Sequence, residues 1–127
     1  MALDLNIKIL VVDDFSTMRK IIRNILSQLG FKNIIEADDG TSAMEILSKE
    51  KIDLIISDWN MPKMSGLELL KAVRSNEQTK DLPFIMVTAE AQKENILEAI
   101  KYRVSQYIVK PFTPETLKEK LEKVFGG

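Results

Sequence analysis

The sequence lacks both cysteine and histidine among its 127 residues. Without cysteine it has no disulfide framework and no thiolate nucleophile, and without histidine it has no imidazole base and no Ser-His-Asp triad. The usual zinc ligands are missing with them. Any chemistry of this chain must therefore use carboxylate, hydroxyl, amide and lysine side chains.

An excess of charge and a long apolar run are also absent. The 18 basic and 19 acidic residues leave a net charge of −1, with no basic stripe for binding a phosphate backbone. No apolar segment approaches the ~18 residues of a membrane-spanning helix, and residues 1–6 lack the features of a secretory signal. We therefore expect a cytoplasmic protein that binds neither nucleic acid nor membrane.

Five short apolar segments of strand character alternate with five segments of helical period. The alternation predicts one α/β domain over residues 1–127, a parallel sheet with helices on both faces. For such a flavodoxin-like, doubly wound (βα)5 fold we expect the strand order 2-1-3-4-5. The strands are expected near residues 8–12, 34–35, 54–57, 84–88 and 107–109, and the helices near 16–29, 41–49, from 65, 92–101 and 114–125.

Two of the expected strands end on carboxylates. The third strand ends at Asp58, and the first ends at Asp13 and Asp14. These strands are neighbours in the expected order, about 4.8 Å apart, so the three carboxylates should converge at the carboxyl edge of the sheet. Like charges that converge either raise a pKa or hold a divalent cation, and an open site with few oxygen ligands favours Mg²⁺.

Two further polar residues, Thr88 and Lys110, end the fourth and fifth expected strands at the same edge. A cation, a hydroxyl and an amine that face a carboxylate suit a transferring phosphoryl group, whose charge is spread over its oxygens. We interpret Asp58 as the nucleophile, which forms an aspartyl phosphate, with Lys110 and Thr88 contacting phosphoryl oxygens. Mg²⁺ would bridge Asp14, Asp58 and the phosphoryl group.

A second acidic pair, Asp38 and Asp39, also follows an expected strand. That strand lies at the sheet edge in the expected order, and Gly40 makes a turn, so we interpret this pair as structural. Asp13 and Asp14, taken alone, would favour a capping role for the next helix. The third acid beside them reverses that interpretation.

The spacing of several motifs makes the whole chain resemble the receiver domains of two-component response regulators. Two further features narrow the resemblance to the single-domain chemotaxis members, namely the run after Asp58 and a tyrosine three residues before Lys110. The motifs are Asp13-Asp14, Asp58-Trp59-Asn60-Met61-Pro62, Thr88-Ala89, Tyr107 and Lys110-Pro111-Phe112.

The resemblance implies a role for each matching position. Asp58 is implied as the phosphoacceptor, with Lys110 and Thr88 as its catalytic partners. Thr88 and Tyr107 are implied as a switch pair, and a cis peptide is implied before Pro111. The implied metal ligands are Asp13, Asp14, Asp58 and the main-chain carbonyl of Asn60, and the candidates for setting phosphoryl lifetime are Asn60 and Glu90.

One position departs from the family pattern. Receivers commonly carry a small residue and glycine after the fourth helix, where this chain has Tyr102 and Arg103. Glycine adopts a left-handed cap without steric cost, so Arg103 either strains that turn or leaves the helix by another path. The family's partner face, built from the fourth helix, the fifth strand and the fifth helix, would here include Lys93, Tyr102, Arg103 and Tyr107.

The expected function is a signalling switch and not a conventional enzyme, although the switch catalyses its own phosphorylation and dephosphorylation. A histidine kinase would donate the phosphoryl group, and the altered surface would bind a flagellar motor switch protein or another target peptide. A phosphatase is a further possible partner, and we expect a monomer. No DNA-binding domain is expected after the last helix, so the output must be binding.

Three alternatives remain open at this point. The chain could be a receiver of another phosphorelay pathway, or an engineered or consensus scaffold with altered partner binding. It could also be a Mg²⁺-dependent aspartyl-phosphate phosphatase, but such enzymes typically need a second acid two residues after the nucleophile, where this chain has Asn60, and a cap over the site.

Overall fold

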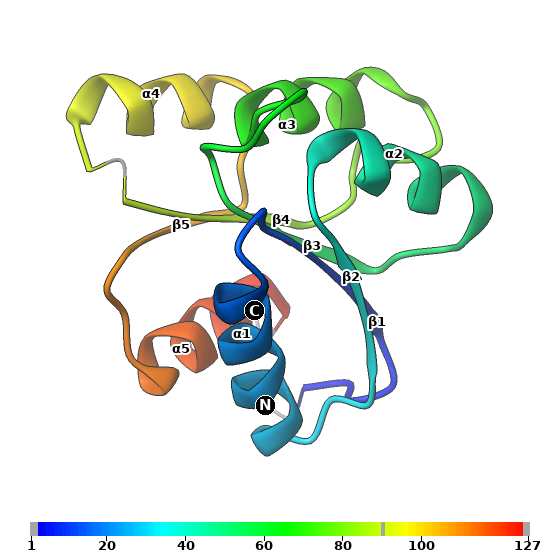
Figure 1. Ribbon diagram of the computed structural model, residues 1–127, viewed down its shortest axis with the longest axis vertical. Helices are drawn as coiled ribbons and strands as arrows, with labels where there is room; N and C mark the ends of the chain where they lie inside the picture. The colour runs from blue at the N-terminus through cyan, green and yellow to red at the C-terminus, as the bar shows by residue number, and fades with distance from the viewer. Residues whose placement is uncertain (1–2, 90, 126–127) are drawn as a thin grey trace.

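The computed structural model describes residues 3–89 and 91–125. It contains one parallel five-stranded sheet in the order β2-β1-β3-β4-β5, which confirms the predicted flavodoxin-like fold. In Figure 1, α1 and α5 cover one face of the sheet, and α2, α3 and α4 cover the other. The strands are β1 (Lys8–Val12), β2 (Asn33–Ala37), β3 (Leu54–Ser57), β4 (Phe84–Thr88) and β5 (Gln106–Val109), and the helices are α1 (Ser16–Gln28), α2 (Gly40–Lys49), α3 (Gly66–Ser75), α4 (Lys93–Lys101) and α5 (Pro114–Phe125).

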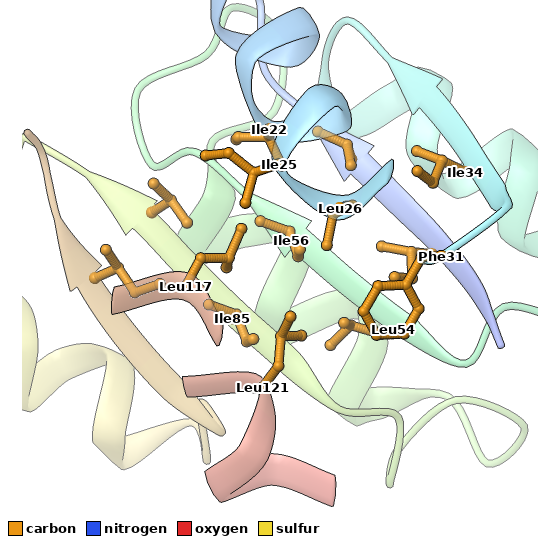
Figure 2. Packing of buried hydrophobic residues seen from close by; sticks show 14 residues of the cluster. Ile22, Ile25, Leu26, Phe31, Ile34, Leu54, Ile56, Ile85, Leu117 and Leu121 are labelled. Atoms are coloured by element: carbon orange, nitrogen blue, oxygen red, sulfur yellow. The ribbon is translucent and has the colours of Figure 1, made fainter. Parts of the chain in front are cut away.

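The central strands are buried on both faces, because successive side chains of a strand point to opposite sides of the sheet. One set of strand residues packs against α1 and α5, where Ile22, Leu26, Leu117 and Leu121 meet Ile56 (Figure 2). The alternate set packs against the other helices. Its strand members are Leu10, Val12, Ile55, Phe84 and Met86, and its α3 members are Leu69, Leu70 and Val73.

The strand register fixes where the polar residues at the sheet edge lie. Val12 of β1 is paired with Ser57 of β3, so the residues that follow them leave the sheet side by side. The N–H of Asp58 donates to the carbonyl of Val12 at 2.9 Å, and the N–H of Asp13 donates to the carbonyl of Ala37 at 3.1 Å. Both acids are therefore tied by their main chains to a neighbouring strand.

Arg103 adopts the left-handed conformation, with φ of 62°, directly after Tyr102 caps α4. Of the two outcomes that the sequence allowed, the strained turn is the one observed. Arg74 of α3 stabilises it, since its Nε and Nη2 atoms donate to the carbonyl of Arg103 at 3.2 and 2.9 Å.

Among the described residues, no helix has the length and apolar character needed to cross a membrane.

Candidate functional site

Three carboxylates meet at the carboxyl edge of the sheet. Asp13, Asp14 and Asp58 each offer an oxygen atom, and these oxygens all lie within 4.8 Å of one another. Asp13 and Asp58 are buried, with exposed fractions of 1% and 7%, whereas Asp14 is exposed. The convergence predicted from the strand order is therefore observed, in a cluster that opens to solvent on one side.

Lys110 brings the one ammonium group that contacts this cluster among the described residues. Its Nζ atom lies 3.4 Å from Oδ2 of Asp13 and 3.4 Å from Oδ1 of Asp58. The peptide bond between Lys110 and Pro111 is cis, as the resemblance implied. One ammonium against three carboxylates leaves the site with an excess of negative charge.

The pKa of Asp58 reflects its burial first and its charged neighbours second. Burial raises the pKa of Asp58 above its ordinary value, the nearby Lys110 ammonium opposes that rise, and the Asp13 carboxylate adds to it. A divalent cation would relieve this crowding, and carboxylate oxygens are the hard ligands that Mg²⁺ prefers. The acidic pocket of Asp13, Asp14 and Asp58 therefore fits Mg²⁺.

The polar residues of the neighbouring strands lie at the same edge. Thr88 is fully buried at the end of β4, and the N–H of Lys110 donates to its carbonyl at 2.8 Å. On β5, Tyr107 is half-buried, and its ring meets Trp59 edge to face, with 6.4 Å between centroids and 66° between planes. Trp59 is also half-buried, and its main-chain N–H donates to Oδ1 of Asp58 at 2.8 Å. Tyr107 is thus connected to Asp58 through Trp59.

Lys93, Tyr102 and Arg103 make no hydrogen bond or ion pair with the three clustered acids in the described part of the chain. Lys93 begins α4, and Tyr102 and Arg103 follow its end, about 13 Å away along a nine-residue helix. The ring of Tyr102 faces α3, where the Nζ atom of Lys71 lies 4.7 Å from the ring centroid. Asn60 is exposed and follows Trp59. Glu90 lies outside the described residues.

The second acidic pair is structural, as predicted. The side chain of Asp39 caps α2 by accepting the N–H of Ser42 at 2.8 Å, and Asp38 accepts the Ser42 hydroxyl at 2.9 Å. The hydrogen bond from Ser42 lowers the pKa of Asp39 below its ordinary value, although burial opposes this effect. This pair is satisfied within its own turn.

Two residues near the site were missed by sequence reasoning. Nη1 of Arg19 donates to the main-chain carbonyl of Asp13 at 2.6 Å. Gly66 begins α3 so close to the main chain of Asp58 that a Cβ atom there would lie 2.0 Å from the Asp58 carbonyl oxygen. The glycine at a helix start was a usable signal, because close backbone approach is one reason for glycine. The arginine gave none, since a helical arginine is ordinarily solvated.

Comparisons with known proteins agree with this geometry. The family model of the response regulator receiver domain matches residues 9–122. The chemotaxis protein CheY-3 of Vibrio cholerae serotype O1 is 56% identical over 123 residues, 97% of this chain and 95% of the relative. The chemotaxis protein CheY of Pseudomonas aeruginosa is 57% identical over 118 residues, 93% of this chain and 95% of the relative.

A solved structure gives the same answer for the fold. The chemotaxis protein CheY4 of Vibrio cholerae matches with a TM-score of 0.88 and 38% identity, covering 94% of this chain and 99% of that chain. CheY is itself a standard example of the strand order 2-1-3-4-5 and of binding where the strand order reverses. The acid cluster, the strand order and these matches together show that the chain belongs to the response regulator receiver domain family.

Proposed function

We propose that this chain is a chemotaxis response regulator that accepts a phosphoryl group on Asp58 from a phosphohistidine of a histidine kinase. The observation that carries the proposal is the position of the Lys110 amine, 3.4 Å from oxygens of both Asp13 and Asp58 within the acid cluster. The names of the chemotaxis relatives support the pathway. The receiver domain is proposed to span residues 1–127.

The chemistry follows from the side chains present. An Asp58 carboxylate oxygen attacks phosphorus, the new O–P bond forms as the P–N bond breaks, and the electron pair returns to the imidazole of the donor. A carboxylate nucleophile needs no general base, which suits a chain without histidine. The positive charge of the Lys110 ammonium group offsets the negative charge of one phosphoryl oxygen, and the Thr88 hydroxyl donates a hydrogen bond to another.

Asp13, Asp14, Asp58 and the main-chain carbonyl of Asn60 are the proposed ligands of Mg²⁺. The bound ion supplies positive charge for the phosphoryl oxygens and offsets the carboxylate crowding. Asp13 has a second task, since its Oδ2 atom lies 3.4 Å from the Lys110 amine and so helps to orient it. Asn60 and Glu90 remain our candidates for setting the lifetime of the phosphoryl group.

The proposed output is a change of binding surface. Thr88 and Tyr107 form the switch pair, and the target, proposed to be a flagellar motor switch protein, reads a face that includes Lys93, Tyr102 and Arg103. The two states need differ by only a few kcal/mol, because the phosphoryl group biases them through its different contacts in each. The protein would act in the cytoplasm as a monomer and would be a signalling protein that turns over only its own phosphoryl group.

The test uses acetyl phosphate as the phosphodonor and mass spectrometry as the readout. With Mg²⁺ the wild type should gain about 80 Da, the mass of one phosphoryl group, and Asp58→Asn should gain nothing. Asp38→Asn is the matched control, because Asp38 also follows a strand but bonds only within its own turn in the described structure; it should be labelled like the wild type. An adduct on Asp58→Asn, or none on the wild type, would refute the proposal.

A further inference from the structure

Arg19, in the first turns of α1, reaches back to the loop that carries the acids. Its Nη1 atom donates to the main-chain carbonyl oxygen of Asp13 at 2.6 Å, and its Nε atom donates to Oε1 of Glu36 at 3.0 Å. The Arg19 side chain is mostly buried, with an exposed fraction of 17%. A guanidinium held at two points of its planar fork is a rigid support, unlike a solvated surface cation.

Asp13 is held at four points. Its N–H donates to Ala37, its Oδ1 accepts the N–H of Phe15 at 2.9 Å, and its Oδ2 lies 3.4 Å from Lys110. The contact between its carbonyl and Arg19 is the fourth. Of the two side chains that contact Asp13 in the described structure, Lys110 is a proposed catalytic residue, and Arg19 can be removed by mutation without touching that set.

Asp14 depends on the same contact. Its carboxylate is exposed and makes no hydrogen bond or ion pair within residues 3–89 and 91–125. The carbonyl of Asp13 and the N–H of Asp14 belong to one planar peptide unit, so fixing that carbonyl fixes the direction in which the chain continues to Asp14. Anchoring this one atom therefore helps to position the main chain that carries two of the three carboxylates.

Arg23, one turn further along α1, provides an internal contrast. It also pairs with Glu36, through Nη1 and Oε2 at 3.1 Å, but its main-chain contact is the carbonyl of Ile34 at 3.3 Å, inside β2. The two arginines thus carry the same charge, share one carboxylate and lie on one helix. They differ in which carbonyl they hold, and only Arg19 holds that of a clustered acid.

We infer that Arg19 is a positioning residue for the Mg²⁺ site, which presents Asp13 and Asp14 to the ion by anchoring the peptide between them. The inference rests on the proposed function, because it presumes that the acids bind Mg²⁺. The two possible roles of Arg19 predict opposite changes in Mg²⁺ affinity when its side chain is removed. Removing a cation beside a cation site should strengthen metal binding by charge alone, whereas loss of a positioning contact weakens it.

The experiment titrates Mg²⁺ into each protein and follows Trp59 fluorescence, which needs no phosphodonor. Arg19→Ala should weaken Mg²⁺ binding about 10-fold, a typical cost of losing a group that orients a metal ligand. Arg23→Ala should bind Mg²⁺ like the wild type. Arg19→Lys, which keeps the charge but cannot hold both acceptors with a planar fork, should be intermediate. Thermal unfolding identifies any variant that fails to fold.

A second readout reports the hydrogen bond itself. The ¹⁵N shift of the Asp14 amide, which shares a peptide unit with the Asp13 carbonyl, should move in both Arg19 variants without metal and stay in place in Arg23→Ala. Wild-type affinity in both Arg19 variants, or equal losses in the Arg19→Ala and Arg23→Ala proteins, would overturn the inference while leaving the proposed function standing. A wild type that shows no Mg²⁺ binding would overturn both.

Discussion

Two acidic pairs follow neighbouring strands of the sheet, and their carboxylates make different contacts. Asp13 and Asp14 follow β1 and join a third acid, so that like charges converge. Asp38 and Asp39 follow β2, and their carboxylates bond to Ser42 within the turn that starts α2. The residue types are the same, and both pairs come at a strand end. The difference is that β1 lies beside β3, which leads into the third acid, whereas β2 is an outer strand of the sheet.

The third acid that the first pair joins, Asp58, and the capping acid of the second pair, Asp39, have opposite pKa shifts. The pKa of Asp58, in the cluster beside β1, is raised mainly by burial, while the pKa of Asp39 is lowered mainly by the hydrogen bond from Ser42. A raised pKa means that the folded protein favours the neutral carboxyl, and a lowered pKa means that it favours the charged carboxylate. An acid after the outer strand β2 therefore serves a structural role, whereas the acids after the inner strands are available for chemistry.

The largest expected difference between the two pairs is in metal binding. Asp13→Asn should weaken Mg²⁺ binding about 100-fold, the upper end of what disruption of a metal site's ligand support costs, because it removes a charged oxygen from the centre of the cluster. Asp38→Asn should bind Mg²⁺ like the wild type. Titration followed by Trp59 fluorescence measures both, and equal affinities in the two variants would erase the contrast.

The next largest effect is on stability in a chelator, and it should have opposite signs. Asp58→Asn should raise the free energy of unfolding by about 1 kcal/mol, because an amide at this buried position avoids the cost of keeping a charged carboxylate there. Asp39→Ala should lower it by about 1 kcal/mol, the usual cost of losing a helix N-cap. Urea unfolding measures both, and shifts of the same sign would contradict the comparison.

The pH dependence of stability sharpens the contrast further. A raised folded-state pKa gives stability that is present below the unfolded value of 3.8 and lost as pH rises through the folded pKa, so the advantage of Asp58→Asn should grow with rising pH. A lowered pKa does the reverse. The stability from Asp39 is present above 3.8 and is lost as pH falls through the folded pKa. Urea unfolding in chelator on both sides of 3.8 tests the signs, with Asp39→Asn as the partner variant.

The smallest effect is expected at Lys63, the lysine beside the structural pair. Lys63 lies 3.8 Å from Asp39 with a side chain that is 72% exposed, so Lys63→Ala should change the free energy of unfolding by about 0.5 kcal/mol or less. Lys110→Ala should have a clearly larger effect, because the Lys110 amine contacts two buried carboxylates. Thermal unfolding at low and high salt compares them, and a larger effect at Lys63 would show that exposure does not decide the outcome.

The fold and the acid cluster could be predicted from the sequence because both depend on periodic or terminal features of strands. The apolar runs before Asp13 and Asp58 predicted two buried parallel strands, and topology then placed them side by side. The structure confirms this pairing. The observed strand and helix ends differ from the predicted ones by one or two residues, for example Asn33–Ala37 against 34–35 for the second strand, since ends depend on local hydrogen bonds.

Contacts between side chains and distant main-chain atoms could not be predicted. Nothing in the spacing of Arg19 says that it reaches the carbonyl of Asp13, and nothing at Arg74 says that it holds the turn at Arg103. Such contacts need the three-dimensional path of the loop, which sequence periodicity does not encode. Only glycine, as at Gly66, leaves a visible trace of backbone crowding.

The edge-to-face contact between Tyr107 and Trp59 has a spectroscopic consequence. The chain has one tryptophan and two tyrosines, so excitation absorbed by Tyr107 has a single indole to which it can transfer. The tyrosine contribution to the excitation spectrum of Trp59 therefore depends on where the Tyr107 ring stands. The position of that ring can therefore be followed without an added dye, by a signal distinct from the emission intensity used in the Mg²⁺ titration.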